Sequence, residues 1–263
     1  MKNINIPKNE LISKILAIIK KGWIHTDRSR NDGAVGNTLE DLLNIPENNL
    51  AIANTVDWEL KAQRINTTSL TTLFHQDPEP RKPNTVISSY LLPNYGWPHK
   101  EAGQKYSINE MSFRATLSDT FSDRGFCIKV NSIDRRIELA FDYRKVGSRH
   151  KEWLSIVKNK VGLKKITPTP YWNFDDLHKK CVGKIKNTIF VLADSRNNNG
   201  QEEFKYEKIL LLEDFAFNNF LRGIISGDVY IDFDARTGHN HGTKFRIRQK
   251  RWDILYSKIT EVK

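Results

Sequence analysis

Thr55-Val56-Asp57-Trp58-Glu59-Leu60-Lys61-Ala62-Gln63 is the stretch from which the fold and chemistry of this chain are best read. Its apolar and polar residues alternate, and this alternation predicts an extended strand with one buried face. The buried face would carry Val56, Trp58, Leu60 and Ala62. The opposite face would carry Asp57, Glu59, Lys61 and Gln63. The acid and the amine at alternate positions of such a strand project side by side.

Glu59 and Lys61 have the chemistry that metal-dependent hydrolysis of a phosphodiester requires. A carboxylate can hold a divalent cation against the phosphate, and a neighbouring ammonium can steady the attacking water and the growing negative charge. The same Glu-x-Lys pattern also occurs in surface strands as a solvated ion pair. Both interpretations stand when this stretch is considered alone.

The overall composition favours a polyanionic partner. The chain has 263 residues, of which 38% are hydrophobic and 28% charged, and its formal net charge is +11. A positive field of this size attracts phosphates, although a merely basic, solvated surface is the alternative. We expect neither a membrane span nor a secretion signal. Cys127 and Cys181 lack a metal-type spacing, so reduced thiols in a cytosolic protein are expected.

Periodic patterns along the chain predict an α/β fold in which helices flank a mixed central sheet. Helices are expected at residues 9–21, 38–43, 151–160, 175–182 and 213–225. Strands are expected at residues 111–117, 125–130, 136–142, 187–193 and 229–234, and irregular structure at residues 81–103. Asn37 is placed to cap the second helix, with Glu40 three residues on as in a capping box. A functional role for Glu40 is the alternative to this capping role.

Positive charge concentrates in residues 236–251, which include six Lys or Arg and no acid. Alternation in this stretch places Lys244, Arg246 and Arg248 on one strand face, opposite the apolar Phe245. A basic strand face suits a nucleic-acid groove, where arginine pairs with phosphates or guanine edges. The alternative is a solvated edge strand that its charges protect from aggregation.

His239 and His241 stand at alternate positions and would point the same way on a strand. Zinc would need a third or fourth convergent ligand, which the surrounding sequence does not supply. We therefore expect the two histidines to act as donors to bases or phosphate.

Six segments follow one another in a specific order along the chain. They are Asp32-Gly33-Ala34-Val35-Gly36, Thr38-Leu39-Glu40-Asp41-Leu42-Leu43, Glu47-Asn48-Asn49-Leu50, Trp58-Glu59-Leu60-Lys61, residues 70–75 and residues 239–246. In this order they resemble the MvaI/BcnI-type restriction endonucleases, relatives of the mismatch-repair nickase MutH in the PD-(D/E)xK superfamily. The resemblance covers most of the chain and is strongest between Gly33 and Pro78.

The resemblance implies a restriction-endonuclease-like fold in which two lobes form a DNA clamp. It implies a single endonuclease domain, residues 1–263, with a catalytic lobe centred on residues 22–145 and a recognition lobe centred on residues 165–263. The implied enzyme is a Type II restriction endonuclease that cuts double-stranded DNA at a CC-N-GG-like site with Mg²⁺, for which Mn²⁺ can substitute. It is expected to act as a monomer in a prokaryotic cytoplasm, nicking the strands in turn, with a cognate DNA methyltransferase as its genetic partner.

The resemblance also implies a catalytic set of Glu40, Asn54, Glu59 and Lys61, in which Asn54 and Glu59 hold the metal. The family has an aspartate five residues before the strand glutamate, where this chain has Asn54. An amide oxygen can coordinate Mg²⁺, but the site then has one negative charge fewer.

Three explanations compete for this departure. Asn54 is a working ligand, Asp57 substitutes for it, or the site is impaired and the chain only binds DNA. We favour the first, because Glu40, Glu59 and Lys61 are in place. A MutH-like strand-specific nickase in repair is a further alternative.

Recognition residues follow from the resemblance in the same way. They are expected to contact DNA bases near the cleavage site or in the major groove, and they are His75, Asp234, Arg236, His239, His241, Lys244 and Arg246.

Overall fold

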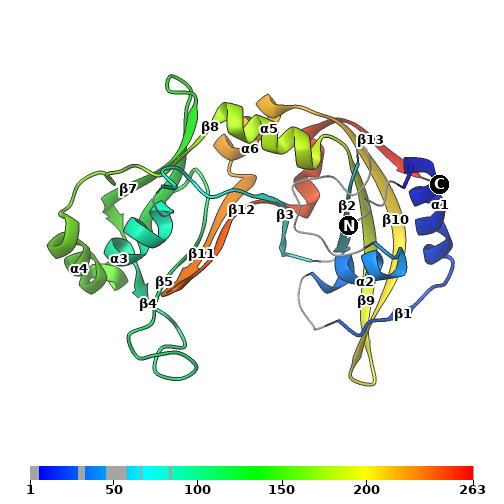
Figure 1. The fold of residues 1–263 in the computed structure, drawn as a ribbon, viewed down its shortest axis with the longest axis horizontal. Coiled ribbons are helices and arrows are strands. Elements are labelled where there is room, and N and C mark those ends of the chain that lie inside the picture. Colours follow the sequence, from blue (N-terminus) through cyan, green and yellow to red (C-terminus); the bar gives the residue numbers. More distant parts are fainter. Residues whose placement is uncertain (1–5, 29–32, 46–57, 66, 83–84, 263) are drawn as a thin grey trace. The chain divides into compact units, whose positions relative to one another are not determined.

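The computed structural model describes the chain except for residues 1–5, 29–32, 46–57, 66, 83–84 and 263 (Figure 1). The chain forms two compact units, each assembled from stretches that are separate in the sequence. Unit 1 comprises Met1–Thr71, Lys179–Asn219 and Arg248–Lys263, and unit 2 comprises Thr72–His178 and Phe220–Ile247. The expected lobes centred on residues 22–145 and 165–263 stay a prediction.

Unit 1 is built on a mixed five-stranded sheet. Its strand order is β1-β10-β9-β2, and β13 also pairs with β10. The strands are β1 (Ile24–His25), β2 (Glu59–Arg64), β9 (Thr188–Asn198), β10 (Gln201–Phe215) and β13 (Tyr256–Val262). The strand β2 runs parallel to β9, whereas the other pairs are antiparallel. The α/β class with a mixed sheet, expected from the sequence, is confirmed.

Two N-terminal helices cover a face of this sheet. They are α1 (Lys8–Ile19) and α2 (Ala34–Leu42). The apolar stripe of α1 and the buried side of α2 join Leu60 of β2 and the apolar residues of β9 and β10 in one core. The Tyr206 hydroxyl of β10 donates a hydrogen bond to the Val35 carbonyl of α2 at 2.8 Å. This bond fixes α2 beside the sheet that carries β2.

Unit 2 contains two further sheets. The first has the order β3-β12-β11-β5-β4, and the second has the order β6-β7-β8. The strands of the first are β3 (Leu70–His75), β4 (Trp97–Pro98), β5 (Met111–Leu117), β11 (Val229–Arg236) and β12 (His239–Arg248). The strands of the second are β6 (Arg124–Asn131), β7 (Arg136–Val146) and β8 (Tyr171–Asn173). The expected strands at residues 111–117, 125–130, 136–142 and 229–234 are thereby confirmed.

The remaining helices connect these strands. They are the π-helix η1 (Ile87–Leu91), α3 (Leu92–Tyr95), the 3-10 helix η2 (Ser148–His150), α4 (Lys151–Val161), α5 (Phe174–Ile185), α6 (Phe217–Ile225) and the 3-10 helix η3 (Gln249–Leu255). No helix among the described residues has both the length and the apolar character that crossing a membrane requires.

Aromatic side chains form the core of unit 2 between its sheets and helices. Phe126 lies 5.3 Å from Phe113 and 5.0 Å from Phe141, measured between ring centroids. Trp153 of α4 donates its indole N–H to the Tyr95 carbonyl at 3.1 Å. The helix α4 is therefore held to unit 2 through its buried side.

Three sequence-based expectations about elements are wrong. The second helix begins at Ala34 with Gly33 as its N-cap, so Asn37 lies inside the helix and the capping-box role for Glu40 is excluded. Residues 213–225 do not form one helix, because β10 extends to Phe215 through pairing with β13 and α6 begins only at Phe217. Residues 81–103 contain η1 and α3, which bury their large apolar side chains by folding as helix.

We predict that unit 2 loses stability in mild acid through His150. Arg124 Nη1 donates to His150 Nδ1 at 2.8 Å, so Nε2 carries the proton and meets Asp123 Oδ2 at 2.9 Å. Burial, and then the Arg124 charge, lower the pKa of His150 below its ordinary value of 6.5, although Asp123 opposes this. The unfolded chain then takes up this proton at a higher pH than the folded protein does. Stability is therefore expected to fall as the pH drops through 6.5.

His150→Gln should flatten this pH dependence, because glutamine keeps a neutral donor and acceptor but does not titrate. The measurement is the thermal midpoint of unfolding on both sides of the ordinary histidine pKa, with the exposed His178→Gln as the control. Equal pH dependence of wild type and His150→Gln would contradict the prediction.

Candidate functional site

Glu59 and Lys61 lie side by side on β2. Lys61 Nζ is 3.5 Å from Glu59 Oε1, and the side chains of Lys61 and Glu59 are 14% and 10% exposed, respectively. Their common direction follows from the two-residue period of the strand. The interpretation as a solvated surface pair is wrong, because both groups are largely removed from water.

One oxygen of the Glu59 carboxylate lacks a hydrogen-bond partner among the described residues. Oε1 faces Lys61, whereas Oε2 is buried and has no hydrogen bond to any described residue. A buried carboxylate oxygen without a partner is costly unless a proton, a water or a cation completes it. This oxygen is a suitable ligand for a hard divalent cation.

A second lysine, Lys184 of α5, carries a charge that interacts with the same pair. Burial lowers the pKa of Lys184, the Glu59 charge raises it, and the Lys61 charge lowers it again. The charge of Lys184 thus interacts with both Glu59 and Lys61. Sequence reasoning missed this residue because it lies in a lysine-rich helix end that resembles a solvated face.

The base of the site is fixed by a buried tyrosine. The Glu59 amide donates to the Asn187 carbonyl at 3.0 Å, and Glu59 stands opposite Thr188 in the parallel register. The Tyr256 hydroxyl donates to the Ile185 carbonyl at 2.8 Å and lies 3.0 Å from Thr188 Oγ1. Burial raises the pKa of Tyr256. Tyr256 therefore ties the end of α5, which carries Lys184, to the start of β9.

The other members of the expected catalytic set are placed only in part. Glu40 is on α2, a helix that lies next to β2 in unit 1, and its side chain is half-buried. Asn54 and Asp57 lie outside the described residues, so their places as ligands stay predictions. Among the residues that are described, no three His, Cys, Asp or Glu side chains gather to hold a metal ion.

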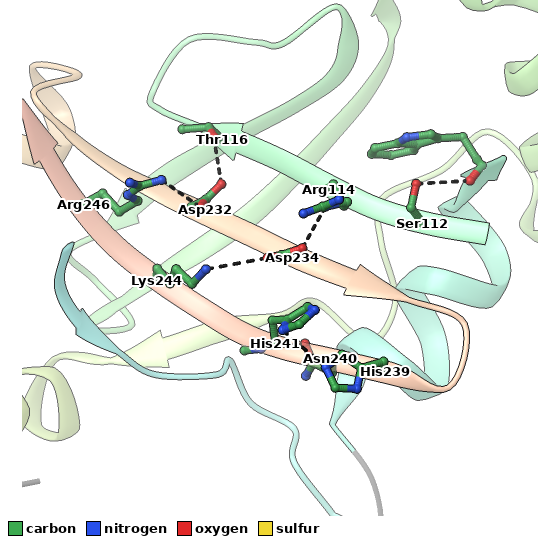
Figure 2. Close-up of polar contacts among 12 residues, drawn as sticks. Ser112, Arg114, Thr116, Asp232, Asp234, His239, Asn240, His241, Lys244 and Arg246 are labelled. Carbon is green, nitrogen blue, oxygen red and sulfur yellow. Dashed lines mark hydrogen bonds and ion pairs between the residues drawn. The ribbon is translucent and has the colours of Figure 1, made fainter. Parts of the chain in front are cut away.

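A polar face covers the middle of the first sheet of unit 2 (Figure 2). The strands β5, β11 and β12 direct alternate side chains to it, while the intervening residues, such as Phe233 and Phe245, are buried. We call this surface the sheet face; its charged members are Arg114, Asp232, Asp234, Lys244 and Arg246.

Two rows of charged contacts cross the sheet face (Figure 2). In the first, Asp234 lies 2.7 Å from Arg114 and 3.6 Å from Lys244. In the second, Asp232 accepts from the Thr116 hydroxyl at 2.8 Å and pairs with Arg246 at 3.2 Å.

The expected basic face is therefore a face of alternating sign. Its cations come from β12 and β5, and its acids come from the neighbouring β11. The interpretation as an edge strand is wrong, because β12 has β3 on one side and β11 on the other.

The two histidines point together at the start of β12. His239 Nε2 lies 3.3 Å from His241 Nδ1, as the strand period predicts. Asp77, which follows β3, shapes this segment by accepting from the Thr243 amide at 2.8 Å and from Asn240 Nδ2 at 3.3 Å. Sequence reasoning missed the role of Asp77, because the sequence shows only an acid between β3 and a proline.

Arg236 and His75 complete the expected recognition set. Arg236 Nη1 donates to Glu110 at 3.0 Å, and its guanidinium lies 4.6 Å from the centre of the Tyr106 ring. Glu110 is buried, so it anchors the Arg236 guanidinium to the interior of unit 2. His75 is the exposed last residue of β3, the strand next to β12.

Comparison with known proteins gives one family and a set of solved structures. The model of the MvaI/BcnI restriction endonuclease family matches residues 12–256. A solved structure of the restriction endonuclease MvaI in complex with cognate DNA substrate is 24% identical, with a TM-score of 0.76, over 96% of this chain and 97% of that one. MvaI in the absence of DNA is 22% identical, with a TM-score of 0.53, over the full length of both chains. No curated protein sequence matches the chain.

We predict that Asp77→Ala makes residues 239–243, which include His239 and His241, less stable. The buried Thr243 loses the acceptor of its amide, which is expected to cost about 1–3 kcal/mol of unfolding free energy. Urea unfolding gives the cost, and amide hydrogen exchange over residues 239–243 locates it. Asp77→Asn keeps one acceptor oxygen and should cost less. Unchanged exchange in Asp77→Ala would rule out this role.

Proposed function

Because the chain belongs to the MvaI/BcnI restriction endonuclease family and is therefore a site-specific deoxyribonuclease, we propose that Glu59 and Lys61 form its cleavage centre. The observation that carries this proposal is the buried pair on β2, in which one glutamate oxygen has no hydrogen-bond partner among the described residues. A buried acid and amine of this kind suit catalysis better than stability, since a hydrophobic pair would cost less to bury.

The proposed cofactor is Mg²⁺, for which Mn²⁺ can substitute. The orphaned Glu59 Oε2 fits such an ion, and Asn54 is the proposed second ligand, with Asp57 as the alternative. When bound, the ion would neutralise charge on the scissile phosphate and polarise it toward attack.

The protein groups divide the remaining work. Lys61 is held against Glu59 and would orient the attacking water as an ammonium group, or accept the proton of that water if it has first lost its own, so that the oxygen approaches phosphorus opposite the leaving oxygen. Lys184, whose charge interacts with this pair, is proposed to help stabilise the phosphate as negative charge grows. Glu40, on the neighbouring helix α2, is proposed to adjust the charge of the site through a water molecule on the metal ion.

The sheet face is the proposed reader of base pairs. Arginine and lysine donate to guanine O6 and N7, and an aspartate can accept from cytosine N4, so a face of alternating sign matches C·G pairs. The proposed readers are His75, Asp234, Arg236, His239, His241, Lys244 and Arg246. Ion pairs within the face hold Lys244 and Arg246 in place before DNA arrives. A CC-N-GG-like site is the sequence we propose.

A single Glu-x-Lys pair can cleave only one phosphodiester bond at a time. We therefore propose a monomer that nicks the two strands in turn and works in a prokaryotic cytoplasm. A cognate methyltransferase would protect the same sites in the host DNA.

We predict that Glu59→Gln lowers the rate constant of DNA cleavage by about a thousandfold or more, since an amide cannot supply the carboxylate charge. Removing divalent cations with a chelator should have the same effect. Asn54→Asp should retain or raise the rate. The measurement is single-turnover cleavage of phage DNA with Mg²⁺, and sequencing of the fragment ends gives the recognition site. Glu207→Gln, an exposed ion-paired glutamate, is the control.

The outcomes of this experiment distinguish a restriction endonuclease from a silent DNA-binding protein and from a nickase. Equal activity of wild type and Glu59→Gln would discard the cleavage centre. Binding without cleavage in Mg²⁺ and in Mn²⁺ would leave a silent DNA-binding protein, as Asn54 allows. Cleavage of only one strand of unmethylated plasmid would favour a nickase that depends on a repair partner.

We predict that Arg246→Gln weakens binding to the recognised sequence by about 1–3 kcal/mol and relaxes the choice of base at one position. Asp232→Asn should give a smaller loss in the same direction, because it only frees Arg246 from its neighbour. Fluorescence anisotropy with duplexes that carry each base substitution measures both effects. Arg135→Gln, an exposed arginine on the β6–β7 turn, is the control. Uniform weakening across all sequences would show that Arg246 contacts phosphate instead.

A further inference from the structure

Most of the excess positive charge of the chain lies away from the sheet face. Residues 143–165 contain eight Lys or Arg and one acid, Glu152, which is a net of seven of the eleven formal charges. We call these eight basic residues the α4 patch. They are Arg144, Lys145, Arg149, Lys151, Lys158, Lys160, Lys164 and Lys165.

Every member of the α4 patch is exposed. Arg144 and Arg149 are ion-paired with aspartates, yet their side chains are 74% and 75% exposed. Lys160 donates to the Pro93 carbonyl at 2.8 Å. The ammonium groups of the other five lysines have no hydrogen-bond or ion-pair partner among the described residues.

The sheet face shows the opposite arrangement. Lys244, Arg246 and Arg236 each lie against a carboxylate of the same unit. Their charges are thus largely compensated, which suits selective contacts to base edges. The α4 patch instead presents positive charge that few acids of unit 2 offset.

The fold directs the patch outward. Trp153 and Val157 turn one side of α4 into the aromatic core of unit 2. Lys151 and Lys158 are seven residues apart and therefore share a stripe on the other side, about 10 Å apart along the helix axis. Gly162, at a φ of 74°, ends the helix, and Lys164 and Lys165 extend the charge beyond it.

We propose that the α4 patch is a second DNA-binding surface, which neutralises phosphates of the duplex outside the recognised sequence. This inference rests on the proposed function, because it takes duplex DNA as the partner. Lysines supply point charges on flexible stems, which suit backbone phosphates rather than the fixed pattern of base edges. Such contacts hold the protein on DNA of any sequence and let it search along the duplex.

The test compares two triple variants that change the net charge equally. One is Lys151→Gln with Lys158→Gln and Lys164→Gln in the α4 patch. The control is Lys14→Gln with Lys20→Gln and Lys21→Gln, three exposed lysines at or just beyond α1 in unit 1. Dissociation constants are measured without divalent cations, over a range of salt. The probes are a long duplex without the recognition sequence and a short duplex that ends just outside it.

The patch variant is expected to bind the long duplex on the order of a hundredfold more weakly at about 0.1 M salt. The slope of its affinity against salt should be smaller by about 0.9 for each phosphate that the variant no longer neutralises. The control variant should bind that duplex like wild type. Cleavage of the short duplex with Mg²⁺ should be unchanged in both variants.

Equal weakening in the patch and control variants would overturn the proposal, since net charge alone would then explain binding. An unchanged salt slope in the patch variant would overturn it too, as would weaker binding to anionic lipid vesicles with unchanged binding to DNA. Failure of the wild type to cleave the short duplex would instead count against the proposed function, and the long-duplex measurement would still decide the role of the patch.

Discussion

The burial of the Glu59 carboxylate beside the Lys61 ammonium group is the constraint on which the site depends. The Glu59 side chain is largely removed from water, so its charge must be compensated by Lys61, by the positive charge of Lys184 and by whatever completes its second oxygen. Two buried tyrosines hold the elements around Glu59 in place. Tyr256 ties α5 to β9, and Tyr206 holds α2 against the sheet.

Charge is organised differently in the two parts of unit 2 that we connect with DNA. On the sheet face, acids of β11 separate the cations of β5 and β12, which fixes their side chains and removes most of their net field. Around α4 the cations are exposed, and most of them have no partner among the described residues. Fixed donors and acceptors discriminate between base pairs, whereas mobile charges respond to any phosphate. Unit 2 can thus combine sequence-selective contacts to bases with binding to the phosphates of any DNA sequence.

Local patterns predict the parts of the fold that depend on nearby residues. The helix at residues 9–21, the strand at residues 111–117 and the common direction of Glu59 and Lys61 follow from periodicity alone. Periodicity does not predict the fifteen-residue strand β10, and its last three residues fall in the helix expected at residues 213–225, because the pairing of β10 with the distant β13 is not visible in a local pattern. The acids opposite Lys244 and Arg246 come from another strand, so no inspection of residues 236–251 could show them. The roles of Asn54 and Asp57 stay predictions.

The order of elements along the chain has a consequence for biosynthesis. The strand β2 is made early, but its parallel partner β9 and the tyrosine that secures β9 belong to much later stretches. A growing polypeptide on the ribosome can therefore display Glu59 and Lys61 only on an unpaired, solvated segment. The cleavage centre that we propose would therefore assemble only when nearly all of the chain has been translated. An incomplete chain would then lack the arrangement of Glu59 and Lys61 on which the proposed cleavage depends.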